Sequence, residues 1–352
     1  MRWFVLCVAI AGCADAPLPT RSDAARYLDD TAFRRGVLVG ELVNPANGYG
    51  QLRLDHYAVD GGWDDLPEWN PSVDAMPPLA FDAGAIVDDP IALAALGEQA
   101  FTRYPVQIWR AAPAGAESMV EVSGNPPVLA ATCATCHATV RSGSMVMGLA
   151  NGAIDLGWGP GRLDVTTADG HEPVRIPDLR PVALASYLHA DANVRATDVI
   201  ALAVRIETLI ITSHDEAVRP PRILALALAT YLDSLAPSAP VPPTSEPAIH
   251  GASLFAANCA GCHSSAAYDG EPVALDVVGT DPAVGLSHDR GTGTYRVPSL
   301  RGVADRTWLL HDASVSSLAM LLDPTRPSPG HRFGQALSAD DRAALVAFLQ
   351  TL

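Results

Sequence analysis

The spacing of apolar and polar residues predicts a chain that is mostly helical after about residue 85. Apolar residues recur at helical spacing and give several segments a broad apolar face, as in helices that pack on a core. The last segment begins with Ser338-x-x-Asp341, the pattern of a capping box. We expect helices over residues 89–101, 198–211, 222–235, 250–258 and 338–352.

Two segments lack this spacing. Residues 42–71 are rich in Asn, Gly, Pro and aromatic residues, and they are predicted to form loops with a short hairpin, packed on the part that follows. Residues 236–247 contain many prolines and predict a stiff, extended linker, which is the clearest domain boundary in the chain.

Composition and charge narrow the class of protein. With 352 residues, 49% of them hydrophobic, the chain is long enough for two domains with their own cores. The net charge is -16, and all 23 basic residues are arginine. This charge argues against nucleic acid as a partner, because phosphate binding needs clustered cations. A basic partner, or no charged partner, is more natural.

The first residues have the pattern of an export signal. Arg2 precedes an apolar run from Trp3 to Ile10, which is too short to span a bilayer. The sequence Ile-Ala-Gly-Cys ending at Cys13 resembles a bacterial lipobox, so residues 1–12 are predicted to be removed and Cys13 to be lipid-modified. The alternative is cleavage after Ala16. No later stretch has the pattern of a transmembrane helix. We expect an exported protein on the periplasmic face or cell surface, held to the membrane by lipid.

Four cysteines lie in two short motifs, CATCH at 133–137 and CAGCH at 259–263. Disulfides within each pair would close very small loops and leave the adjacent histidines unexplained. Paired cysteines of a zinc site usually lie about 15–20 residues apart, far closer than these two pairs. Cys-x-x-Cys-His is the spacing that attaches haem c, with thioether bonds from both thiols and imidazole on the iron. We therefore predict two haem c groups, bound through Cys133, Cys136, Cys259 and Cys262, with His137 and His263 as iron ligands.

An internal repeat accompanies the two motifs. Residues 176–194 align without gaps to residues 297–315 and are identical at nine of nineteen positions. The segments lie 121 residues apart, close to the 126 that separate the motifs. The repeat predicts two duplicated haem domains.

The repeat also indicates candidates for the second axial ligand of each iron. His214 and His331 lie at equivalent positions, each in a loop before the last helix of its domain. Arg180 and Arg301 also align, and guanidinium groups suit the carboxylates of haem propionates. The alternative for these arginines is a structural salt bridge. Other candidate ligands are Met145, Met147, Met320, His189 and His311.

Three motifs resemble one family. Leu96-Gly97-x-x-x-Phe101 precedes CATCH, Gly251-x-x-Leu254-Phe255-x-x-Asn258 precedes CAGCH, and Val-Pro-Ser-Leu-Arg at 297–301 is followed by His311-Asp312. Over residues 90–352 the chain resembles the bacterial di-haem cytochrome c peroxidases and related di-haem cytochromes.

The repeat and the resemblance together predict a mainly α fold with two duplicated cytochrome c-like haem domains. The residue pattern before them predicts a largely irregular N-terminal extension. The domains expected are a signal peptide (1–12), the extension (13–85), a first cytochrome c domain (86–236), the linker (237–247) and a second cytochrome c domain (248–352).

One departure from the family affects the expected activity. In those peroxidases a methionine typically holds the C-terminal haem, whereas here Thr325 and Arg326 stand where that methionine is expected. Two bis-histidine irons favour single-electron transfer with redox partners such as other cytochromes or copper proteins. The alternatives are hydrogen peroxide reduction, related haem oxidoreductase chemistry, or a subunit of a larger respiratory complex. In the peroxidase alternative His214 would leave its iron, and Glu216 is the nearest acid candidate.

Overall fold

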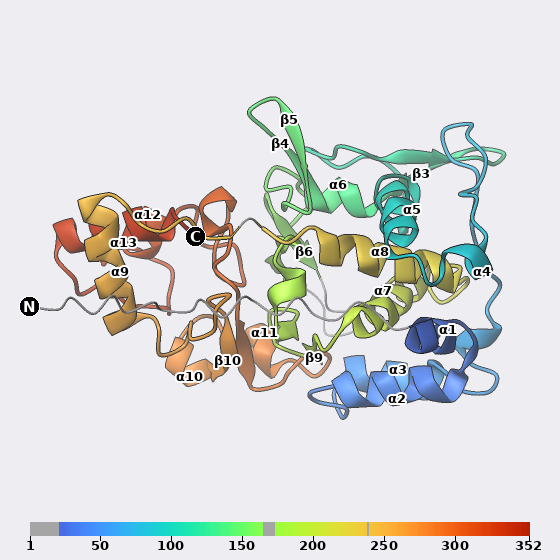
Figure 1. Ribbon diagram of the computed structural model, residues 1–352, viewed down its shortest axis with the longest axis horizontal. Helices are drawn as coiled ribbons and strands as arrows, with labels where there is room; N and C mark the ends of the chain where they lie inside the picture. Colours follow the sequence, from blue (N-terminus) through green and yellow to red (C-terminus); the bar gives the residue numbers. More distant parts are fainter. Residues whose placement is uncertain (1–20, 165–172, 238) are drawn as a thin grey trace, which may run out of the picture.

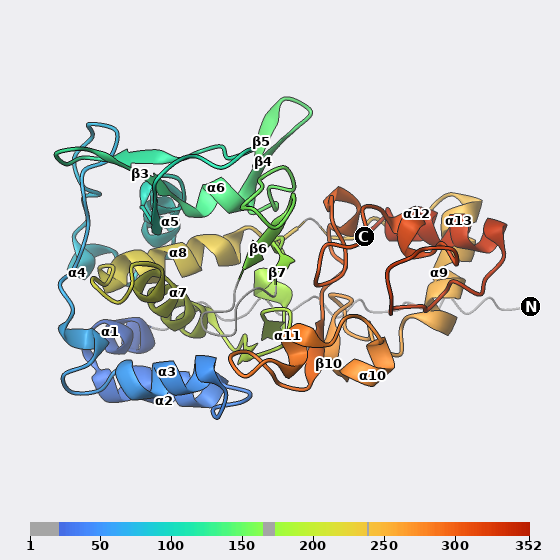
Figure 2. The same ribbon diagram turned by 180° about the vertical axis from the view of Figure 1, so that it is seen from behind.

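The computed structural model describes residues 21–164, 173–237 and 239–352, and it shows two lobes side by side (Figure 1). The larger lobe contains the chain up to the proline-rich linker, and the smaller lobe contains the C-terminal part (Figure 2). The predicted signal peptide (1–12) and Cys13 lie outside the described residues. Within the described residues, no helix has the length and apolar character needed to cross a membrane.

Helices form the core of both lobes. In the larger lobe they are α1 (Arg21–Asp29), α2 (Thr31–Glu41), α3 (Gly48–His56), α4 (Ala83–Ile86), α5 (Pro90–Arg103), α6 (Cys133–His137), α7 (Val199–Ser213) and α8 (Arg222–Ser234). In the smaller lobe they are α9 (Glu246–Asn258), α10 (Leu275–Val278), α11 (Ala283–Leu286), α12 (Leu318–Leu321) and α13 (Ala339–Leu349). Short 3-10 turns are η1 (Trp63–Asp65), η2 (Val182–Leu184) and η3 (Val303–Asp305).

Small antiparallel sheets lie between these helices. One has three strands in the order β1-β3-β2, formed by β1 (Gln107–Trp109), β2 (Val120–Val122) and β3 (Val128–Ala131). The two-stranded sheets are β4 (Ala138–Arg141) with β5 (Ser144–Met147), β6 (Arg162–Asp164) with β7 (Pro173–Arg175), β8 (Tyr187–Leu188) with β9 (Val194–Arg195), and β10 (Gly270–Ala274) with β11 (Thr294–Val297).

The predicted fold class, mainly α with two duplicated cytochrome c-like domains, is wrong: the fold mixes helices with several small sheets. The strands come from the long segments that join the helices, where apolar helical spacing is absent and short antiparallel pairs satisfy the backbone. The N-terminal extension is also not largely irregular, since it contains α1, α2 and α3. Helix α3 was not predicted, because its glycines obscure the helical spacing of apolar residues. The Asn47 side chain caps this helix by accepting from the Gly50 N–H.

The long helices predicted from apolar spacing are confirmed. Asp89 caps α5 by accepting from the N–H groups of Ile91 and Ala92, and Pro90 occupies the first turn. Asp198 caps α7 in the same way. The Ser338 side chain accepts from the Asp341 N–H at 3.1 Å, which starts α13 where the capping box was predicted.

The likeness between the two halves is local. In each lobe one glycine lets two helices touch: a Cβ on Gly97 of α5 would overlap the Ala227 carbonyl of α8, and a Cβ on Gly251 of α9 would overlap the Ala344 carbonyl of α13. These are the Leu-Gly and Gly-x-x-Leu positions of the sequence motifs. The close approach fixes where each cysteine motif enters its core.

The repeated segments also fold alike. The turns η2 and η3 occur at equivalent positions, and the pairing of Leu188 with Val194 matches that of Leu309 with Val315. Left-handed residues recur in register: His189 has φ 64 and its counterpart Leu310 has φ 63. The duplication therefore covers a helix pair and this segment, while the sheets and loops around them differ.

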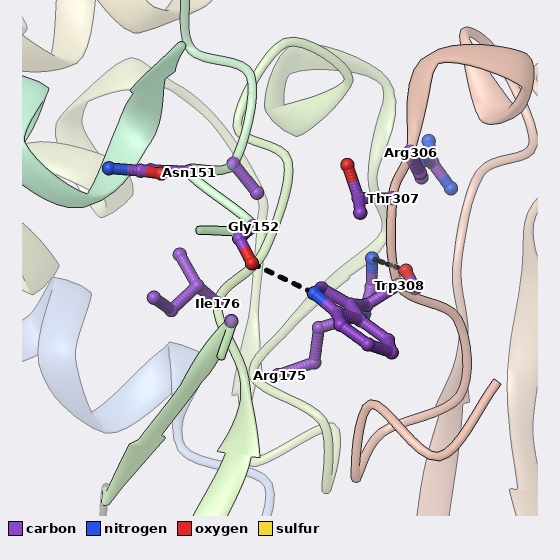
Figure 3. Close-up of a pocket in the computed structure, with 9 residues that line it drawn as sticks. Asn151, Gly152, Arg175, Ile176, Arg306, Thr307 and Trp308 are labelled. Atoms are coloured by element: carbon purple, nitrogen blue, oxygen red, sulfur yellow. Dashed lines mark hydrogen bonds between the residues drawn. The ribbon is translucent and has the colours of Figure 1, made fainter. Parts of the chain in front are cut away.

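The lobes meet along the repeat. Figure 3 shows the indole of Trp308 pointing to the Gly152 carbonyl, and its Nε1–H donates there at 3.0 Å. The Arg175 guanidinium donates to the carbonyls of Leu310 and Trp308, each at 3.1 Å. A Cβ on Gly152 would lie 2.9 Å from the Thr307 Cβ. Side chains of the smaller lobe therefore fit closely against the segment that follows the first cysteine motif.

The glycine contacts predict a stability difference. Gly251→Ala places a methyl group against the α13 backbone and 2.8 Å from the Phe348 Cβ, so the free energy of unfolding should fall by about 1–3 kcal/mol. Gly36→Ala in α2 is the matched control, because its Cβ meets nothing within 4 Å; it should leave stability unchanged or raise it by up to about 1 kcal/mol. Denaturant unfolding of both variants checks this, and equal effects would contradict it.

Candidate haem sites

The first cysteine motif is the short helix α6, which directly follows strand β3. Its start is fixed by side chains: the Thr132 N–H donates to the Thr135 hydroxyl oxygen at 2.9 Å, and both hydroxyls donate to the Ser118 carbonyl at 3.0 and 3.1 Å. Helical spacing places the two cysteines and the histidine of the motif on one side of the turn. From that side the two thiols and the imidazole could bind one and the same ligand.

His137 is held in a single tautomer. Its Nδ1 lies 3.0 Å from the Pro177 carbonyl oxygen, which can only accept, so Nδ1 carries the proton and Nε2 keeps its lone pair. The Gly148 N–H donates to the His137 carbonyl at 2.7 Å and fixes the backbone. Burial lowers the pKa of His137 to about 4, so the ring is neutral at neutral pH. A neutral, oriented imidazole is the form that ligates iron.

His263 of the second motif has the same arrangement on a different backbone. The motif begins where α9 ends, and the Cys259 N–H still donates to the Phe255 carbonyl at 2.8 Å. The His263 Nδ1 lies 2.7 Å from the Tyr268 carbonyl oxygen, which again leaves Nε2 free. Burial lowers the pKa of this ring as well.

The four motif cysteines are free thiols. Burial raises the pKa of Cys133 to about 12 and the pKa values of Cys136 and Cys259 to about 11, so these thiols stay protonated and sit in apolar surroundings. Two free thiols beside an imidazole with an available Nε2 are the donor set of haem c. The residues of both motifs therefore fit that cofactor.

Of the two predicted distal histidines, His331 lies near its motif. Burial lowers the pKa of His331 to about 4, and the charge of His263 is the next largest cause. The two rings are therefore close enough for their charges to interact. The His331 Nδ1 is buried and has no hydrogen-bond partner among the described residues. The backbone is left-handed, with φ 44, and its N–H donates to the Val278 carbonyl at 2.6 Å. An immobilised, neutral imidazole with an unused ring nitrogen suits a ligand position.

His214 is placed differently. It is the C-cap of α7, its Nε2 lies 3.2 Å from the Pro105 carbonyl oxygen, and its ring packs edge-on against Trp69 at 4.6 Å. No interaction between His214 and His137 occurs within the described part of the chain. Ligation by His214 stays a prediction, and it would require the Pro105 contact to break.

The two aligned arginines do not share one environment. The Arg180 guanidinium forms ion pairs with Asp178 at 2.9 Å and with Asp305 at 2.7 Å. Arg301 is buried and donates to the Pro237 carbonyl at 2.6 Å. For Arg180 the structural salt bridge considered from the sequence is present, and propionate binding by either arginine stays a prediction.

The other candidates are spread through the structure. Met145 is exposed, Met147 packs against the larger core, and Met320 lies in α12. The His189 Nε2 accepts from Arg205, His311 stacks on Tyr295 at 4.2 Å, and the Glu216 carboxylate accepts from the Trp63 indole at 2.9 Å.

A buried ion pair that the sequence did not indicate lies between the two motif histidines. Asp178 follows the proline that binds His137, and its carboxylate lies 3.2 Å from the Arg306 Nε. Burial lowers the pKa of both rings; as smaller influences, the charge of Asp178 opposes this at His137, whereas the charge of Arg306 adds to it at His263. The repeat gives no signal for this pair, because it aligns Asp178 with Ser299 and Arg306 with Ala185.

Comparison with known proteins agrees with the haem assignment. Residues 248–352 match the family model Cytochrome c. A solved structure, the diheme peroxidase BthA from Burkholderia thailandensis E264, is 16% identical and superposes with a TM-score of 0.41, over 82% of this chain and 94% of that one. No curated protein matches.

The family-model match covers the second cysteine motif and supports covalently bound haem c there. The family model matches only this one domain. The superposition is loose, so the roles proposed below rest on the residues of this chain.

The ion pair predicts a pH-dependent stability. Burial alone would raise the pKa of Asp178, but the hydrogen bond from Arg180 and the charge of Arg306 outweigh it and hold the pKa below its usual value. The stabilisation is therefore complete above about pH 4 and is lost as the pH falls through the lowered pKa. Asp178→Asn should lower the free energy of unfolding at pH 7 by about 3–5 kcal/mol.

Asp305→Asn is the matched control, since Asp305 also pairs with Arg180 but is 54% exposed, against 2% for Asp178. It should cost at most about 1 kcal/mol. Urea unfolding at pH 7 and at pH 3 measures both variants, and a loss for Asp178→Asn no larger than the control's would contradict the assignment.

Proposed function

We propose that this chain is a di-haem c-type cytochrome that carries single electrons between redox partner proteins, with one haem at each cysteine motif. Bound haem iron supplies a reversible one-electron couple. The observations that carry the proposal are that the His331 ring lies within range of a charge interaction with His263 and that its buried Nδ1 has no hydrogen-bond partner among the described residues. Both imidazoles could therefore hold one iron, which would leave it no position for a substrate. Such a site exchanges electrons but does not bind a substrate at the metal.

The chain's own residues would orient and shield the second haem. The Tyr268 carbonyl holds the Nδ1 proton of His263, and the aromatic side chains of Phe255, Tyr268 and Phe348 pack against one another beside the motif. Exclusion of water from this shell lowers the reorganisation that accompanies a change of charge. At the first motif the Pro177 carbonyl has the corresponding role toward His137.

We also propose export and lipid anchoring, through the signal of residues 1–12 and Cys13, on the sequence pattern alone. The net charge of -16 favours a redox partner with a basic surface, such as another cytochrome or a copper protein, over an acidic one.

His331→Gly tests the bis-histidine site. In the wild-type holoprotein, which should carry two haem additions by mass, the C-terminal haem is expected to be low-spin and inert to carbon monoxide. Removal of the distal imidazole should make that haem high-spin and allow it to bind carbon monoxide. Electron paramagnetic resonance and absorption spectra measure this, and added imidazole should restore the low-spin signal. An unchanged spectrum in His331→Gly would exclude His331 as the ligand.

The placement of His214 favours a second function, reduction of hydrogen peroxide at the first haem. The His214 ring contacts the Pro105 carbonyl and Trp69 instead of the first motif, which supports a first haem whose iron is held by His137 alone. An iron with an open axial position can accept an exogenous ligand such as peroxide.

His214→Ala separates the two functions. If the His214 ring stays at Pro105, wild type and variant should have the same spectrum, with one haem per chain that binds carbon monoxide, and the wild type should reduce peroxide with a reduced cytochrome as donor. If instead the variant converts a low-spin first haem to high spin, His214 is a ligand and the electron-carrier function is favoured.

A further inference from the structure

A cluster of arginines surrounds Tyr49 where the N-terminal helices meet the C-terminal half of the chain. The guanidinium carbon of Arg53, on α3, lies 3.4 Å from the centroid of the Tyr49 ring. Arg290, from the segment before β11, lies at 5.2 Å, and Arg205, on α7, at 5.9 Å. Three cations around one aromatic ring form a positively charged site that only the folded chain assembles.

His189 completes this cluster and is held in one tautomer. Its ring packs edge-on against Tyr49 at 5.1 Å, and its Nε2 accepts from the Arg205 Nε–H at 2.6 Å. Because Nε2 accepts, the proton of the neutral ring must be on Nδ1. That Nδ1–H is buried and has no acceptor among the described residues, and the same holds for the Nη1 of Arg205. Two buried donors of one hydrogen-bonded pair thus lack an acceptor.

The charges at this place are unbalanced. Burial, followed by the charges of Arg290, Arg205, Arg53 and Arg296, lowers the pKa of His189 well below its usual value, so all four arginines act on this ring. Buried cations cost several kcal/mol each unless an anion compensates them.

Among the described residues, the carboxylate of Asp191 forms an ion pair with one arginine of the cluster. Its Oδ2 accepts from the Arg290 Nε at 3.2 Å. The charge of Asp191 acts on Arg205. No hydrogen bond within the described parts of the chain joins Asp191 to His189 or Arg205, however, and its buried Oδ1 has no donor there. A second acceptor with negative charge would satisfy the two unused donors.

We propose that the His189 Nδ1–H and the Arg205 Nη1–H form a binding site for an oxyanion, a carboxylate or phosphate group, with Arg53 as supporting charge. Two sources supply this chemistry: a propionate of a haem bound to this chain, or a free anion such as inorganic phosphate. The first source rests on the proposed function, and the second does not. Neither of the arginines predicted from the sequence for propionates, Arg180 and Arg301, belongs to this cluster.

The experiment compares Arg205→Gln, Arg205→Lys and the wild type as full-length holoprotein, with Arg195→Gln as the matched control at an exposed arginine on the nearby strand β9. Inorganic phosphate is titrated into each by calorimetry, and each is titrated electrochemically. Circular dichroism confirms that the variants fold, and Arg205→Lys retains the charge if Arg205→Gln does not fold.

With a free anion as the ligand, phosphate binds the wild type and the Arg195→Gln control alike, and Arg205→Gln weakens it about tenfold or more. With a propionate as the ligand, phosphate does not bind the wild type, and Arg205→Gln lowers the reduction potential of one haem, because loss of a nearby positive charge favours the oxidised iron.

Absence of phosphate binding together with an unchanged potential in Arg205→Gln and Arg205→Lys would overturn the site. Failure of the proposed function would give a different result: the wild-type protein would carry one haem or none. Phosphate binding to that protein could still be measured and would still test the oxyanion site.

Discussion

The orientation of two imidazoles by main-chain carbonyls is the interaction on which the rest of this structure depends. Pro177 accepts from His137 and Tyr268 accepts from His263, so each ring keeps its Nε2 directed away from the backbone. A haem iron binds an imidazole through the ring nitrogen that carries no proton, and this tautomer leaves Nε2 available for it. The Pro177 carbonyl lies in a loop of the repeat, and the Tyr268 carbonyl lies in a turn after the second motif. Two different backbone segments therefore fix the same tautomer of the motif histidine.

Around these rings the lobes are joined by groups that act on both sites. The pair of Asp178 and Arg306 lies between the histidines, and Trp308 binds the Gly152 carbonyl of the opposite lobe. Since a buried charge changes the energy of any nearby change in oxidation state, this pair would influence the potential of a haem bound at either motif. The two lobes are therefore joined by contacts that also reach both motif histidines.

The correction to the fold class has a physical reason. Apolar helical spacing marked the long helices and the capping residues marked their starts, because both are local properties of the chain. The sheets and the helix α3 were missed. Short antiparallel strands depend on a partner elsewhere in the chain, and α3 depends on burial of Tyr49 and Arg53 rather than on its own periodicity.

For the candidate sites, the sequence by itself determined which residues can attach haem, since the spacing of two thiols and an imidazole is a covalent requirement met within five residues. The tertiary structure alone decided which other groups approach them. It placed His331 within range of a charge interaction with His263, packed His214 against Pro105 and Trp69, and paired Arg180 with two aspartates. Equivalent positions in a repeat do not imply equivalent contacts, because each contact depends on the loops that pack around it, and those loops differ between the halves.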